Sequence, residues 1–190
     1  MASTVDIGQG KSARQGYRLE DIAIVPTRRT RSSGDVSTSW QIDAFTFDLP
    51  MVAHPSDATM SPRTVAEATR LGGLGVLDGE GLWTRYDDPE PLLAQIWPEG
   101  AEGPEVTRRL QQMYAEPVKP DLLAARVKEL RAAGGTTAVR LSPQHTVELA
   151  PVVLDSGVDI LVIQGTIVSA EHVSQRGTPL NLKEFIADLD

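Results

Sequence analysis

The stretch from Leu49 to Gly81 constrains the fold of this chain more than any other, because it has the pattern of one complete βαβ unit. An apolar run is followed by a polar loop and then by a helix, in which Ser61 suits the N-cap and Pro62 the first helical position. Gly72-Gly73 ends that helix, and a second apolar run follows. A crossover of this length joins parallel strands, so the sequence predicts a parallel α/β sheet.

Polar residues follow both predicted strands of this unit at the point where each strand ends. Parallel strands end side by side, and parallel α/β folds bind ligands at that edge. The sequence therefore predicts a binding site there, formed by two sets of residues: His54, Ser56 and Asp57 after the first strand, and Asp78, Gly79 and Glu80 after the second.

Each of these side chains also has a purely structural interpretation. The imidazole of His54 either contacts a ligand or is satisfied by a loop carbonyl. Asp57 either contacts a ligand or braces its own loop, because aspartate readily accepts hydrogen bonds from nearby backbone N–H groups. Asp78 and Glu80 either form an acid/base pair or are solvated carboxylates, and we favour solvation because nothing near them in the sequence would perturb their pKa values.

The second half of the chain repeats this architecture without repeating its letters. Alternating apolar strands and amphipathic helices are predicted in four further segments: 136–141, 146–155, 159–164 and 181–189. Four successive βα units describe half of a (βα)8 TIM barrel. Half a barrel would leave two apolar edge strands unpaired, so we expect a piece of a longer polypeptide or completion by another chain. A flattened open sheet is the other possibility.

Composition shifts divide the chain into three parts. Residues 1–16 are small and polar and are expected to be a flexible arm. Residues 17–48 are expected to be an N-terminal extension that packs on the barrel. Residues 49–190 are expected to form the half barrel, with a short helical insertion at about 97–120.

Composition also excludes several classes of function. The chain has no cysteine, which rules out a disulfide, a thiolate metal site and a cysteine nucleophile, and its three histidines lack metal-ligand spacing. The formal net charge of −8 lies wholly in residues 49–190, because the first 48 residues carry equal numbers of acidic and basic side chains. We therefore expect no nucleic-acid partner and no binding to anionic membranes. No apolar run approaches a membrane span, and a cytoplasmic location is expected.

Several segments, in this order, resemble the IMP dehydrogenase/GMP reductase family, and more closely its IMP dehydrogenase-related branch that lacks the regulatory (CBS) insert. The segments are YRLEDIAIVP, LPMVAHPSDATMSP, RLGGLGVLDGEG and GVDILVIQGT. The resemblance implies a (βα)8 barrel, usually tetrameric, that oxidises IMP with NAD or reduces GMP with NADPH.

The resemblance also implies roles for particular residues. The loop of the first strand would contact a purine nucleoside monophosphate (IMP, GMP or XMP) through His54, Ser56 and Asp57. The cofactor side would be formed by Gly79, Glu80, Gln164 and Thr166. His54 and Ser56 stand where the family has a serine and a methionine. Gly79-Glu80 replaces a histidine–asparagine pair, and Gln164 replaces the aspartate that holds the cofactor ribose.

The family's cysteine nucleophile, monovalent-cation loop, phosphate loops and general-base flap all follow the fifth strand or later. The intact protein is therefore expected to be a purine-nucleotide oxidoreductase, while this chain alone is expected to be inactive. The alternative is a non-catalytic purine-nucleotide-binding or assembly protein with the same barrel fold. A third possibility is an unrelated (βα)8 phosphate binder.

Overall fold

The structure is a computed structural model that describes residues 4–26, 28–96, 103–165 and 180–189. The chain divides into two compact units, Met1–Ser37 and Thr38–Asp190, and each is described by itself. The described elements of the first unit are two antiparallel strands and two short 3-10 turns: β1 (Thr4–Gly8), β2 (Lys11–Arg14), η1 (Leu19–Asp21) and η2 (Ser33–Asp35).

The β1–β2 hairpin lies in residues 1–16, for which the sequence predicts a flexible arm. Val5 pairs with Ala13 in the hairpin, and Gly10 adopts a positive φ of 68° in the turn. Glycine occupies this left-handed region without a steric penalty, so the turn that joins the two strands is locally encoded.

The second unit begins with an antiparallel hairpin of β3 (Trp40–Ile42) and β4 (Phe45–Phe47). The rings of Trp40 and Phe47 stack with their centroids 4.8 Å apart. Phe47 is buried against Leu74 and Val76 of the neighbouring sheet. This hairpin therefore covers part of the sheet's apolar face.

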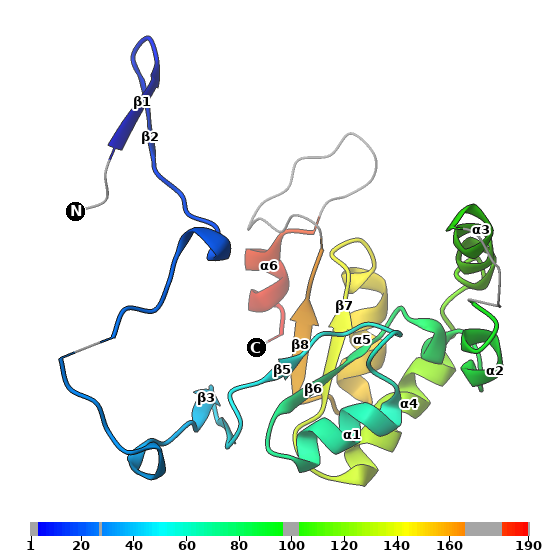
Figure 1. Cartoon of the computed structure of the whole chain (residues 1–190). Coiled ribbons are helices and arrows are strands. Elements are labelled where there is room, and N and C mark those ends of the chain that lie inside the picture. Colours follow the sequence, from blue (N-terminus) through cyan, green and yellow to red (C-terminus); the bar gives the residue numbers. More distant parts are fainter. Residues whose placement is uncertain (1–3, 27, 97–102, 166–179, 190) are drawn as a thin grey trace. The chain divides into compact units, whose positions relative to one another are not determined.

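The centre of the second unit is a four-stranded parallel sheet whose strands follow one another in chain order, as Figure 1 shows. The strands are β5 (Val52–Ala53), β6 (Leu74–Asp78), β7 (Ala138–Leu141) and β8 (Ile160–Ile163). The helices that follow them are α1 (Pro62–Arg70), α4 (Pro120–Ala133), α5 (Thr146–Asp155) and α6 (Leu182–Ala187). Between β6 and α4 lie η3 (Leu82–Thr84), α2 (Glu90–Leu93) and α3 (Gly103–Met113).

The sheet buries side chains on both faces, in the alternation that its pleat dictates. On one face, Leu77, Val139 and Leu141 join a core formed with α1, α4 and α5. On the other face, Val76 and Ala138 pack with the β3–β4 hairpin. Four consecutive parallel βα units with these two faces are half of a (βα)8 barrel.

Helix α1 starts as the sequence predicts. Ser61 Oγ accepts a hydrogen bond from the Thr64 N–H (3.2 Å), and Thr64 Oγ1 accepts one in return from the Ser61 N–H (2.7 Å). This reciprocal arrangement satisfies two otherwise free donors. The helix therefore begins at Pro62, and the preceding loop, which carries the candidate nucleotide residues, ends at a defined point.

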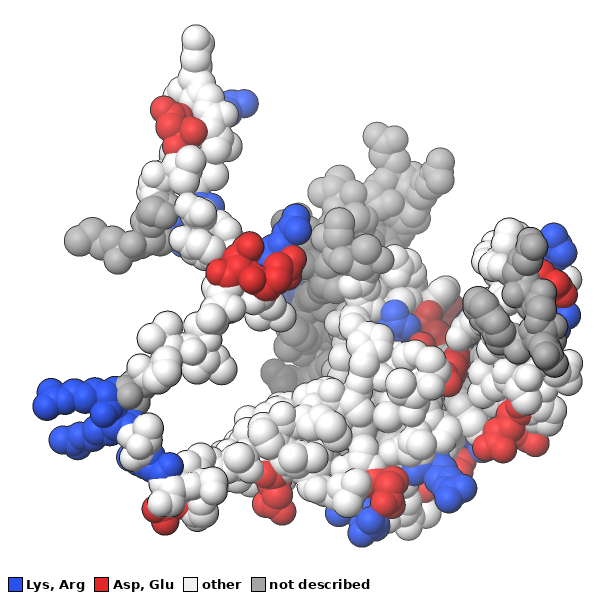
Figure 2. All heavy atoms as spheres, in the orientation of Figure 1, with Lys and Arg blue, Asp and Glu red and all other residues white. Residues whose placement is uncertain are grey.

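Figure 2 shows acidic and basic side chains interspersed on the visible face of the larger unit, with no broad basic area there. Among the residues that the structure describes, no helix is both long enough and apolar enough to cross a membrane.

Candidate functional site

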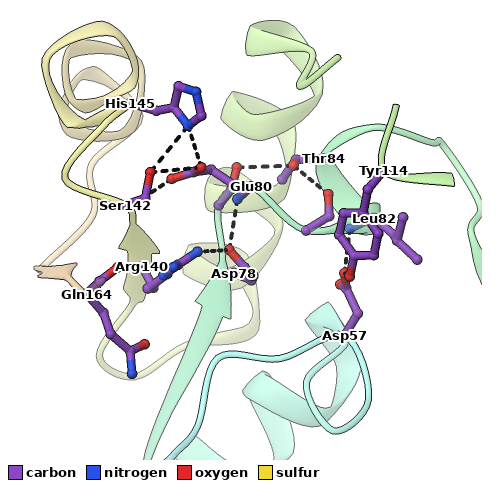
Figure 3. Close-up of polar contacts among 12 residues, drawn as sticks. Asp57, Asp78, Glu80, Leu82, Thr84, Tyr114, Arg140, Ser142, His145 and Gln164 are labelled. Carbon is purple, nitrogen blue, oxygen red and sulfur yellow. Dashed lines mark hydrogen bonds and ion pairs between the residues drawn. The ribbon is translucent and has the colours of Figure 1, made fainter. Parts of the chain in front are cut away.

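The C-terminal edge of the sheet carries a partly buried ion pair between neighbouring strands. Asp78 and Arg140 are register partners on β6 and β7, and Arg140 Nη1 lies 3.1 Å from Asp78 Oδ1. Arg140 Nη2 donates to the backbone carbonyl of Gln164, just after β8, at 3.0 Å. One guanidinium thus joins the ends of three parallel strands, as Figure 3 shows.

The environment of Asp78 makes ionisation costly. Burial raises the pKa of Asp78 above its ordinary value, and the Glu80 N–H and the Arg140 guanidinium only partly oppose this effect. The positive charge of Arg140 therefore offsets part of the free-energy cost of holding the Asp78 carboxylate away from water.

Glu80 lies in a second network, which links the loops after β6 and β7. One carboxylate oxygen accepts a short hydrogen bond from the Ser142 N–H. The other oxygen accepts from Ser142 Oγ at 3.0 Å and lies 2.6 Å from His145 Nδ1. Burial disfavours the ionised form of Glu80, but these hydrogen bonds outweigh it and hold the pKa of Glu80 below its ordinary value.

This network does not have the geometry of a Ser–His–acid triad. Ser142 Oγ lies 3.2 Å from His145 Nδ1, the same nitrogen that faces Glu80. A triad needs the serine and the acid on opposite ring nitrogens. The arrangement instead fastens the loop after β6 to the start of α5.

The expectation that Asp78 and Glu80 are solvated carboxylates is therefore wrong. Their side chains are 17% and 10% exposed, respectively, and each has a partner more than 60 positions away in the sequence. Residues adjacent in the sequence do not reveal these partners, because the partners come from the next strand of the sheet and from the loop that follows it.

Asp57 braces a neighbouring loop rather than its own. Its Oδ2 accepts hydrogen bonds from the Leu82 N–H at 2.8 Å and from the Tyr114 hydroxyl at 2.5 Å. Gly81 makes room for this carboxylate, since a Cβ at that position would lie 2.5 Å from Asp57 Oδ1. The loop after β5 is thus locked to the loop after β6.

His54 and Ser56 lie on the same loop as Asp57. The His54 side chain is exposed, and its imidazole makes no hydrogen bond within the described part of the chain. Its carbonyl accepts from Thr59 Oγ1 at 3.3 Å, and Ser56 Oγ accepts from the Ala58 N–H at the same distance. Hydrogen bonds of the Ser56 and Thr59 hydroxyl groups therefore order the loop, while the His54 imidazole remains available to contact a ligand.

The residues predicted for the cofactor side differ in how available they are. Gly79 is buried against β7, where an added Cβ would lie 2.9 Å from the Arg140 carbonyl oxygen. The Gln164 backbone bonds to β7, but its side-chain amide has no hydrogen bond within the described ranges and points away from Arg140 in Figure 3. Thr166 lies outside the described residues.

Sequence analysis missed four residues of this site: Tyr114, Arg140, Ser142 and His145. Arg140 had a usable signal, because an arginine between the apolar Val139 and Leu141, near the end of a predicted strand, needs a polar partner. Tyr114 had none, since it lies in an insertion whose packing depends on tertiary structure. In the described part of the chain, no group of three or more His, Asp or Glu side chains is placed to hold a metal ion.

Four parallel βα units with a polar C-terminal edge define the class: half of a (βα)8 barrel with its ligand-binding edge. No protein-family model matches the chain. Uncharacterized oxidoreductases of Mycolicibacterium smegmatis and Mycobacterium tuberculosis are 56% identical to it over 189 residues, and one of Mycobacterium leprae is 53% identical. Each match covers 98% of this chain and 50% of the relative, so the chain spans about half the length of these relatives.

The crystal structure of an IMP dehydrogenase/GMP reductase-like protein from Corynebacterium glutamicum matches with a TM-score of 0.86 and 49% identity. This match covers 98% of the chain and 50% of the crystallised one. The resemblance to the IMP dehydrogenase/GMP reductase family and the half-barrel fold are both confirmed.

Proposed function

We propose that this chain is part of an oxidoreductase that exchanges hydride between a purine nucleoside monophosphate and NAD or NADPH. One observation carries the proposal: the polar C-terminal edge belongs to a half barrel that is 49% identical to an IMP dehydrogenase/GMP reductase-like protein. The names of the mycobacterial relatives support the oxidoreductase class.

The loop after β5 is the proposed nucleotide side. His54 offers an exposed imidazole, and Ser56 offers a hydroxyl two residues further along. Asp57 offers Oδ1, which accepts no hydrogen bond within the described ranges. Imidazole, hydroxyl and carboxylate groups together suit a ligand that carries both a phosphate and hydroxyl groups.

The proposed cofactor side is formed by Gly79, Glu80, Gln164 and Thr166. The structure describes the first three of these. Of them, Gln164 has a side-chain amide with no hydrogen-bond partner within the described ranges, and an amide offers both a donor and an acceptor to a ribose hydroxyl. A nicotinamide bound there would accept or donate the hydride. The role of Gln164 is to hold the cofactor's sugar.

The chain would need a second part to turn over. It contains no cysteine, so the proposed covalent step requires a thiolate from elsewhere, and any monovalent-cation site would lie there too. We propose that the remaining half of the barrel supplies these groups and that the intact protein is an oligomer, most simply a tetramer.

One observation favours a second candidate function, a non-catalytic nucleotide-binding or assembly protein. On the proposed cofactor side, both Glu80 carboxylate oxygens are engaged by Ser142 and His145, and Gly79 is covered by β7. Such a side would bind a nicotinamide weakly.

Titration of the complete protein separates these functions. Calorimetry with IMP and GMP comes first, followed by NAD or NADPH with absorbance of the reduced nicotinamide as the readout. Nucleotide binding with turnover supports the oxidoreductase, and binding without turnover supports the silent protein. If neither purine nucleotide binds, both functions fail in favour of an unrelated phosphate binder. H54A tests the nucleotide side, and S33A, at an exposed serine of the first unit, is the control.

A further inference from the structure

A hydrogen bond from the residue that follows α3 joins this part of the insertion between β6 and α4 to the candidate nucleotide loop. Tyr114, the first residue after α3, donates its hydroxyl proton to Asp57 Oδ2 at 2.5 Å, and Figure 3 shows the two side chains facing each other. The two residues are 57 positions apart. The contact therefore depends on how the insertion is anchored.

The anchor is formed by two residues that follow η3. Arg85 Nη1 donates to the carbonyls of Tyr114 and Glu116, and its guanidinium carbon lies 5.6 Å from the centre of the Tyr114 ring. The Tyr86 hydroxyl donates to the Met113 carbonyl at 3.0 Å. Arg85 Nε also donates to the Glu80 carbonyl, so this anchor continues into the loop after β6.

The anchored tyrosine has a consequence for Asp57. The Tyr114 hydroxyl and the Leu82 N–H both bind the same carboxylate oxygen, Oδ2. Two donors on one oxygen restrict rotation of the carboxylate, while Oδ1 keeps its lone pairs. Burial and the nearby Asp57 charge raise the pKa of Tyr114, so its hydroxyl remains a donor at neutral pH.

We propose that Tyr114 is a positioning residue for the substrate site: it holds Asp57 so that Oδ1 faces a hydroxyl or N–H donor of a purine nucleoside monophosphate. This inference rests on the proposed function. It assigns the insertion a part in substrate binding that acts through Asp57.

The test compares Y114F with Y17F in the complete protein, with IMP as the probe. Each variant removes one tyrosine hydroxyl, but Tyr17 is an exposed residue of the first unit and only Y114F loses the contact to Asp57. We expect Y114F to weaken IMP binding about tenfold, which corresponds to ~1.4 kcal/mol, and Y17F to change it less than about twofold. Melting temperatures of both variants report any shared loss of stability.

A double-mutant cycle with D57A separates positioning from general damage. If Tyr114 acts through Asp57, D57A and D57A/Y114F bind IMP equally within about twofold, because the tyrosine has no side-chain acceptor left to position. Independent, additive losses overturn the inference. So does an unchanged affinity in Y114F when the wild type binds IMP.

G81A provides a second test should Y114F unfold. The added Cβ would displace the Asp57 carboxylate while leaving the Tyr114 hydroxyl intact. Weaker IMP binding in G81A supports the inference, and unchanged binding overturns it. A wild-type protein that binds neither IMP nor GMP refutes the proposed function itself, which is a different result from a variant that matches the wild type.

Discussion

Arg140 joins the ends of three neighbouring strands at the polar edge, because its guanidinium bonds to both Asp78 and the Gln164 carbonyl. Replacing Arg140 by methionine keeps the bulk of the side chain but leaves the Asp78 carboxylate buried without its counter-charge. We expect R140M to lower the free energy of unfolding by about 3 kcal/mol, as measured by urea denaturation.

The matched control is R140M/D78N, which removes the stranded carboxylate as well. This double variant should be more stable than R140M alone, because a neutral amide tolerates burial better than an unpaired charge. A double variant less stable than R140M would contradict this explanation of the pair.

Glu80 makes the free energy of unfolding depend on pH. Its pKa is lower in the folded protein than in the unfolded chain, so the folded state binds fewer protons. The stability that it contributes is fully present above the ordinary glutamate pKa and is lost as the pH falls through the folded value. The raised pKa of Asp78 acts in the opposite direction, because the folded state gains stability as Asp78 takes up a proton.

We therefore expect E80Q to be less stable than the wild type at about pH 7 and to approach it as the pH falls towards about 3. Thermal unfolding at several pH values measures this difference. A gap between the two proteins that stays constant with pH would show that Glu80 acts through its shape alone. E148Q, on the exposed surface of α5, is the control.

At the scale of elements, the close approach of β6 and β7 depends on Gly79. An added Cβ would lie within 2.8 to 2.9 Å of Leu141 Cδ2, the Arg140 carbonyl oxygen and Val139 Cγ1. We expect G79A to destabilise the protein by about 1–3 kcal/mol, because the strand ends must separate. G103A is the control, since nothing lies within 4 Å of its added Cβ. Equal melting temperatures for the two variants would contradict this expectation.

The same elements show how much the sequence could predict. Alternating apolar strands and capped helices are local signals, so the order of the βα units and the start of α1 at Pro62 followed from the residues alone. The contacts of the site did not follow from local signals, because Glu80 contacts Ser142 and His145, which lie 62 and 65 positions further along the sequence. Sequence reasoning placed Asp57 and Glu80 at the correct edge but could not predict which side chains would bind them.

At the scale of the whole molecule, the two edge strands of the sheet are incompletely covered. Val52 of β5 is 53% exposed, and the four residues of β8 are all only half-buried. We expect native mass spectrometry of the purified protein to show either one chain of about twice this length or a second polypeptide, because a closed barrel needs about 250 residues. A folded 190-residue chain alone would contradict this.

The hydrogen bond that holds the loop after β7 to Glu80 also affects how fast a backbone amide of this loop exchanges its hydrogen with solvent. Backbone amides in surface loops commonly exchange their hydrogens with solvent within brief local openings. The Ser142 amide instead donates to a carboxylate oxygen of Glu80, whose side chain is 10% exposed. Its exchange then requires the ends of β6 and β7 to separate, so this loop amide should exchange at a rate close to that of the strands themselves.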